Sequence, residues 1–146
     1  MSTQWHSGGR LATAVRQMSL RAATALYCVG FLIHNADHAR RSVAASPEPV
    51  VWAGTFVAML TAVIVTLVVV GHRHAALSAA VGGAAIAIGV SVSHLLPKWG
   101  PLSDPLPGGR VDAFTWFAVL AEIGCALILC LYGLSYKQRS TSPMFT

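Results

Sequence analysis

One uninterrupted apolar run constrains the fold of this chain more than any other feature. From Val50 to Val70 the sequence contains no charged residue. A helix of about 20 apolar residues is what is needed to cross the ~30 Å hydrocarbon core of a bilayer. Charged residues make up only 10% of the chain, against about 25% in typical soluble domains. The sequence therefore predicts an all-α integral membrane protein.

Three further apolar stretches extend this prediction to a four-helix bundle. We expect spans at about 19–38, 50–70, 75–96 and 113–136, within a single domain that covers residues 1–146. Gly71–His74 is too short to be anything but a turn between antiparallel neighbours. The third span is rich in alanine and glycine, and small residues allow close helix packing in lipid. We therefore expect it at the centre of the bundle.

The N-terminal region allows two interpretations. Residues 1–17 are polar and basic, which predicts a mobile arm before the first span. Alternatively, the first apolar run is the core of a signal peptide that is cleaved near Val43-Ala44-Ala45. The charged stretch His34–Arg41 lies between that run and the cleavage-like site, which is atypical of signal peptides. The sequence therefore favours a retained helix.

The distribution of charge predicts the orientation. Four spans place both termini and the Gly71–His74 turn on one side of the membrane. That side carries basic residues without acids, namely Arg10, Arg16, Arg21, Arg73, Lys137 and Arg139. An excess of Lys and Arg marks the cytoplasmic side. We therefore expect a multi-pass protein of the cell membrane with both termini cytoplasmic.

Ionisable residues gather at the opposite, outer end. His34, Asp37 and His38 have the i, i+3, i+4 spacing that places side chains on one face of a helix. His94 ends the third span at the same level. Glu122 lies roughly 15 Å along the fourth span at 1.5 Å per residue. Three of the four helices thus bring ionisable groups toward one region.

Glu122 is the most unusual of these residues. A carboxylate within a span costs on the order of 3 kcal/mol and normally faces the protein interior with a partner. We expect Glu122 to lie within reach of His34, His94 or Thr115. The alternative to a functional role is a hydrogen-bonded carboxyl that only holds the helices together.

The residue types in this cluster suit a metal. Imidazole and carboxylate groups are ligands for zinc and copper. The candidate ligands are His34, Asp37, His38, His94 and Glu122, and the residues expected to orient them are Ser91, Asp112 and Thr115. Haem between two histidines and proton transfer through Glu122, His34 and Asp37 are the alternatives. Purely structural roles for all of these side chains remain a further interpretation.

Other function classes find less support in the sequence. It contains no phosphate-binding loop, no dinucleotide fingerprint and no G-x-S-x-G motif, which favours a role other than catalysis. No basic cluster is interleaved with aromatic residues, so we expect no binding to nucleic acid. Small size favours an accessory or assembly subunit in contact with lipid, with other membrane subunits or with itself. The alternative is a metal- or haem-binding protein for transport, sensing or electron transfer.

Overall fold

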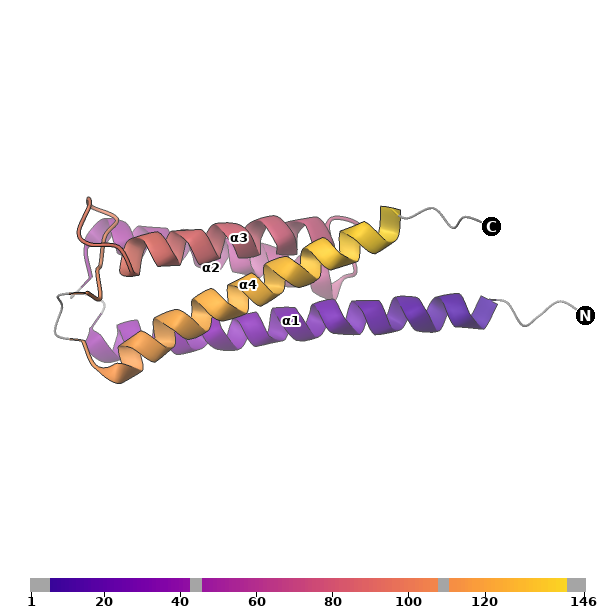
Figure 1. The fold of residues 1–146 in the computed structure, drawn as a ribbon, viewed down its shortest axis with the longest axis horizontal. Helices are drawn as coiled ribbons and strands as arrows, with labels where there is room; N and C mark the ends of the chain where they lie inside the picture. Colours follow the sequence, from indigo (N-terminus) through magenta and orange to yellow (C-terminus); the bar gives the residue numbers. More distant parts are fainter. Residues whose placement is uncertain (1–5, 43–45, 108–110, 142–146) are drawn as a thin grey trace, which may run out of the picture.

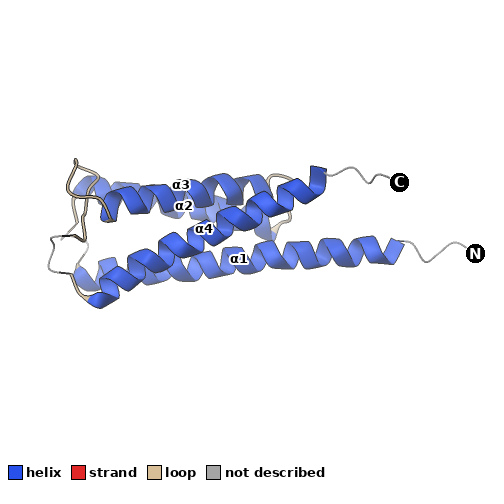
Figure 2. Cartoon of the chain, in the orientation of Figure 1, coloured by secondary structure: helices blue, strands red, loops and turns tan. Residues whose placement is uncertain are grey.

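A computed structural model shows a bundle of four long helices (Figure 1). It describes residues 6–42, 46–107 and 111–141. The helices are α1 (His6–Arg41), α2 (Glu48–Val69), α3 (Ala75–His94) and α4 (Ala113–Thr141). No strand occurs in the described ranges (Figure 2). The predicted all-α class is therefore confirmed for this part of the chain.

The two ends of the bundle differ in what they contain. We call the end that carries His34, His38 and His94 the histidine end, and the end that carries the turn at residues 70–74 the turn end. α1 and α3 finish at the histidine end, whereas α2 and α4 begin there. The start of α1 and the finish of α4 therefore lie together at the turn end (Figure 1).

Three of the described helices are long and apolar enough to cross a membrane. They are α2, α3 and the part of α4 from Ala113 to Tyr136. The chain therefore has the character of a transmembrane protein. α1 is not among the three, because Arg21 and the polar residues from His34 onward limit its apolar part to Ala22–Ile33.

The predicted mobile arm is wrong from residue 6 onward, since α1 already begins at His6. Residues 1–5 and the cleavage-like site at 43–45 lie outside the described residues. A helix of this length measures about 54 Å at 1.5 Å per residue. It is longer than its neighbours and extends past them at the turn end (Figure 1).

The other predicted boundaries shift by a few residues for local reasons. α2 begins at Glu48 rather than residue 50, because proline is tolerated in the first turn of a helix. α3 ends at His94 rather than residue 96, where the following loop folds back. The amides of Asp104 and Leu106 donate to the carbonyls of Ser93 and His94 at 2.9 and 2.8 Å. These bonds satisfy carbonyls that a helix end leaves without partners.

Small residues let α3 and α4 pack at backbone distance. A Cβ at Gly83 would lie 2.6 Å from the carbonyl oxygen of Ala126, and one at Gly133 would lie 2.5 Å from the amide nitrogen of Ala80. Of the three candidate spans, α3 is also the most buried, with 44% of its apolar window inside the protein against 17% for α2. The central position expected for the third span agrees with this burial.

A third glycine brings α1 close to α4. A Cβ at Gly30 would lie 3.1 Å from both the Ala121 carbonyl oxygen and the Cys125 side chain. Gly30 lies one turn before His34, and Ala121 directly precedes Glu122. The close approach of these two backbones therefore sets His34 against Glu122.

α2 is attached mainly through its second half. Thr61, Ile64 and Val68 are buried, and the Thr61 and Tyr27 hydroxyls form a buried hydrogen bond of 2.9 Å. In the first half of α2 only Val50 is buried. The half of α2 at the histidine end is thus loosely packed, and it leaves space beside the histidines.

Candidate metal centre

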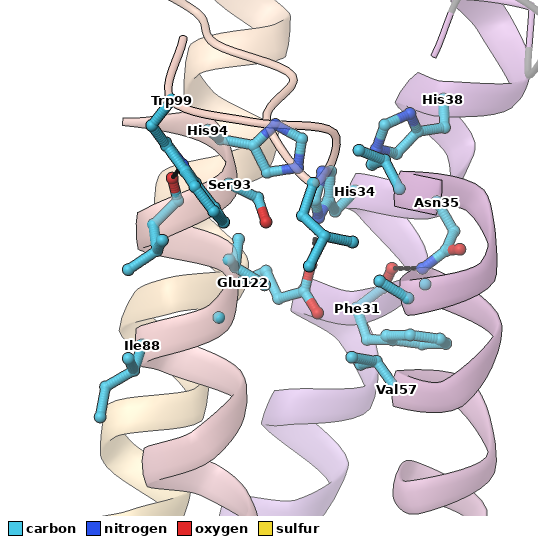
Figure 3. A pocket seen from close by; sticks show the side chains of 17 residues that line it. Phe31, His34, Asn35, His38, Val57, Ile88, Ser93, His94, Trp99 and Glu122 are labelled. Atoms are coloured by element: carbon cyan, nitrogen blue, oxygen red, sulfur yellow. Dashed lines mark hydrogen bonds and ion pairs between the residues drawn. The ribbon is translucent and has the colours of Figure 1, made fainter. Parts of the chain in front are cut away.

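Three imidazole rings from two helices meet at the histidine end. The ring centroids of His34 and His94 lie 5.0 Å apart, those of His34 and His38 4.8 Å, and those of His38 and His94 5.7 Å. One ring nitrogen from each histidine lies within 4.8 Å of the other two. Figure 3 shows the three rings converging above Glu122. The structure thus brings together three of the five ligands predicted from the sequence.

The Nδ1 atom of His94 is held by the loop that follows α3. Nδ1 lies 2.9 Å from the backbone oxygen of Asp104, and a carbonyl can only accept. His94 must therefore carry its proton on Nδ1. Its Nε2 atom retains the lone pair.

The Nδ1 atom of His38 reaches the same loop indirectly. The Ser46 hydroxyl lies 3.2 Å from His38 Nδ1 and donates to the Asp104 carboxylate at 3.1 Å. A hydroxyl has one proton to donate. Ser46 therefore accepts from His38, and His38 also carries its proton on Nδ1.

The Nδ1 atom of His34 is hydrogen-bonded to Oε2 of Glu122 (Figure 3). The sequence predicted that Glu122 would lie within reach of His34, His94 or Thr115, and the contact with His34 is the one observed. A carboxylate accepts the Nδ1 proton and orients the ring, as carboxylates commonly do behind histidines that bind metals. The Nε2 atom of His34 is buried and has no hydrogen-bond partner among the described residues.

These three tautomers leave the lone pair of each histidine on Nε2, in rings whose centroids lie 4.8–5.7 Å apart. Within the described part of the chain, none of the three Nε2 atoms has a hydrogen-bond donor. Lone pairs that approach one another repel, and the buried Nε2 of His34, an acceptor without a partner among the described residues, costs about 1–3 kcal/mol. A cation placed between them removes both costs.

The spacing of the three nitrogens is close to that of a metal site. Zn–N bonds of about 2.0–2.1 Å in a tetrahedron place the ligand nitrogens about 3.3 Å apart. From separations of up to 4.8 Å, each nitrogen would move inward by less than about 1 Å. Small side-chain rotations supply such a shift.

Asp37 lies outside this group, although the sequence placed it among the ligands. Its side chain is fully buried and accepts from Arg40 at 2.7 Å and from Arg41 at 2.9 Å. Arg40 donates a second hydrogen bond to it through Nε at 3.2 Å, and the Thr115 hydroxyl donates another at 3.2 Å. Asp37 thus joins α1 to α4 and pairs with two arginines, whose second partners are Asp112 for Arg40 and Asp104 for Arg41.

Of the residues expected to orient the ligands, Thr115 contacts Asp37, and none of them hydrogen-bonds to the three histidines within the described residues. Thr115 and Asp112 belong to the arginine cluster around Asp37. The backbone amide of Thr115 donates to Asp112 at 3.0 Å, and Arg40 also contacts this carboxylate. Together these interactions lower the pKa of Asp112 to about 2. No hydrogen bond joins the Ser91 side chain to His94 within the described residues.

Sequence reasoning missed the two residues that hold His38 and His94. Asp104 and Ser46 both lie in connections between helices, and nothing in their spacing relates them to a histidine. The proline-rich composition of the connection around Asp104 signals a loop without revealing where that loop folds. The available signal was only that Asp104 is one of five acidic residues in the chain.

A cavity of about 340 Å³ adjoins the three histidines. The histidines and Glu122 contribute polar groups to its wall, together with Asn35 and Ser93. The remaining lining residues come from α1, α2, α3 and the loop after α3, and include Phe31, Val57, Ile88, Trp99 and Leu102. This volume lies within the ~300–1,000 Å³ typical of small-molecule sites.

Comparison of the chain with protein-family models, with curated proteins and with solved structures finds no match.

Proposed function

We propose that this protein is a multi-pass membrane protein that binds one divalent transition metal, zinc or copper, through His34, His38 and His94. The observation that carries the proposal is the convergence of three imidazoles whose Nδ1 atoms are all bonded outward. Within the described residues no donor reaches their Nε2 lone pairs, and that of His34 is buried. Neutral imidazole is a good ligand for both metals.

Glu122, which is hydrogen-bonded to Nδ1 of His34, also supports a metal site. Its carboxylate is buried, and it supplies negative charge next to a metal that would otherwise be poorly solvated in the bundle. Three protein ligands leave a fourth position open, which is the arrangement of metal sites that bind an exchangeable ligand. The cavity is the space into which that position would open.

Haem fits this arrangement less well. Two of the histidines are near enough to act as axial ligands, but a third imidazole lies within 4.8 Å of both. That ring would occupy space needed by the macrocycle. A single metal ion uses all three rings, so we prefer it to haem.

The accessory-subunit role, which small size favours, also remains a prediction. The small residues of α3 add no further support to it. Gly83 and Ala80 are used in contacts with α4 of the same chain, so no partner helix is needed to explain them. Among the described side chains, we find none that specifically favours binding of another membrane subunit.

We further propose that all four helices cross the cell membrane with both termini cytoplasmic. α1 lies alongside three apolar helices, and the exposed turn at the turn end carries Arg73. In a variant without native cysteines, an impermeant maleimide applied to intact cells should label Lys98→Cys and miss Arg73→Cys. Both positions are exposed. The reverse labelling would overturn the orientation.

Metal analysis of the detergent-purified protein tests the proposed site directly. We expect about one zinc or copper ion per chain in the native protein and none in the His34→Ala/His94→Ala variant. The matched control is His72→Ala/His74→Ala, which removes an exposed histidine pair with ring centroids 5.3 Å apart at the turn end. Occupancy that survives in the first variant would reject the metal site and leave the accessory-subunit prediction.

A further inference from the structure

The cavity beside the histidines opens on the flank of the bundle between α2 and α3. Gly54 of α2 and Gly89 of α3 both line it and are exposed, and a Cβ at either position would meet nothing within 4 Å. Ile88 and Trp99 also line the cavity and are 65% and 50% exposed. In a membrane-spanning bundle, this flank faces acyl chains rather than water.

The polar groups lie at one end of the cavity. His38 and His94 stand at the histidine end, whereas Val57 and Ile88 lie deeper along the helices (Figure 3). Ile88 precedes His94 by about 9 Å of helix rise at 1.5 Å per residue. A molecule with a polar head and an apolar tail would therefore lie here as lipids lie in a leaflet, with its head toward the membrane surface.

Charge decides which kind of head group fits. A divalent metal held by three neutral imidazoles carries two positive charges, and Glu122 supplies one negative charge behind His34. One positive charge remains in a largely apolar cavity, where uncompensated charge is costly. A single carboxylate in the open fourth position would neutralise it.

We propose that the cavity binds a long-chain carboxylate, with one carboxylate oxygen on the metal and the hydrocarbon chain leaving between α2 and α3. This inference rests on the proposed metal site. The histidine nitrogens and Glu122 select the charged head, and the cavity together with the open flank selects the tail.

Cobalt(II) provides the readout, because its visible absorption reports both metal binding and replacement of the fourth ligand. The full-length protein in a non-ionic detergent is loaded with cobalt, and sodium oleate is then added. We expect a saturable spectral change with oleate and none at equal concentrations of acetate, which lacks the tail, or oleyl alcohol, which lacks the charge. A response to acetate equal to that of oleate would overturn the role of the cavity.

Substitution of the two glycines tests the path of the tail. In Gly54→Leu/Gly89→Leu, both new side chains project into free space at the opening. We expect cobalt affinity to be unchanged and oleate affinity to fall at least tenfold. The matched control is Gly124→Leu, which also has nothing within 4 Å but does not line the cavity. Its affinity for oleate should equal that of the native protein.

The two proposals fail in different ways. Absence of cobalt binding to the native protein would overturn the proposed function and this inference with it. Cobalt binding without a spectral response to oleate would overturn this inference alone. If the double glycine variant loses cobalt as well, the comparison of oleate with acetate and oleyl alcohol in the native protein decides the matter.

Discussion

The two ends of this bundle are held together by different means. Toward the turn end, α3 and α4 approach so closely that glycines are needed at the contact, and Gly83 faces the backbone of α4. At the histidine end, the helices are joined through polar side chains and a returning loop, beside a cavity of about 340 Å³. Gly89, only six residues after Gly83, faces open space.

This contrast shows how a small membrane protein can combine rigidity with an open site. Backbone contact through small residues fixes α4 against α3, and Gly30 fixes α1 against α4. These contacts determine where His34, His94 and Glu122 stand. The first half of α2 takes no part in them, so space remains beside the histidines without loss of the framework that positions them.

The largest expected effect concerns the close contact at Gly83. We expect Gly83→Leu to lower the free energy of unfolding by about 3 kcal/mol, because the new side chain overlaps the α4 backbone. Unfolding in mixed micelles, followed by circular dichroism, measures the change. Gly89→Leu is the control and should be nearly neutral. Equal losses in the two variants would contradict the contrast between the two ends.

The next effect concerns the carboxylate behind His34. Glu122→Gln keeps the shape of the side chain but removes its charge, so we expect metal affinity to fall about 10–100-fold with the helix content unchanged. Competition with a chelating dye measures the affinity. Glu48→Gln is the control, since Glu48 is exposed at the start of α2 and accepts a hydrogen bond from Trp52. An unaltered affinity in Glu122→Gln would show that the carboxyl has only a packing role.

A smaller effect is expected for the attachment of α2. Tyr27→Phe removes the buried hydrogen bond to Thr61, and such bonds between helices in membranes contribute about 0.6 kcal/mol. A double-mutant cycle with Thr61→Val should show coupling of this size. Tyr132→Phe, at a residue that is 46% exposed, should have no effect. Absence of coupling between Tyr27 and Thr61 would leave the attachment of α2 to apolar packing alone.

The smallest effect concerns Asp112 at the start of α4. The amide of Thr115 and then Arg40 lower its pKa from 3.8 to about 2. Since the pKa in the folded state is the lower one, the stabilisation is complete above about pH 4 and is lost as the pH falls through 2.

Solvent screens this exposed carboxylate, so we expect Asp112→Asn to be only slightly less stable than the native protein at pH 6. Thermal unfolding at a series of pH values should show the two proteins converging near pH 2. If the difference in stability persisted at pH 2, the hydrogen bond from the Thr115 amide to Asp112 would matter rather than the charge of the carboxylate.

Much of the fold could be predicted from the chain itself. The uncharged run Val50–Val70 and the apolar stretches after it predicted α2, α3 and α4 within a few residues, because length and hydropathy alone make a helix able to span a membrane. The extension of α1 back to His6 was missed, since polar residues in a helix leave no periodic apolar signal.

Burial of Glu122 and its contact with His34 could also be expected from the sequence, because a carboxylate in an apolar span requires a polar partner. The i, i+4 spacing of His34 and His38 likewise placed both rings on one face of α1. Local helical geometry and the cost of burying charge were sufficient for these inferences.

The tertiary structure decided which polar groups meet across helices and loops. Arg40 and Arg41 lie one turn from Asp37 on α1, so these ion pairs are local, whereas Thr115 reaches Asp37 only because α4 packs against α1. Asp104 and Ser46 orient His94 and His38 because the loop after α3 folds back onto the helix end. The amides of Asp104 and Leu106 donate to the carbonyls at the end of α3, and these hydrogen bonds set the path of the loop. The spacing of residues along the chain does not reveal them.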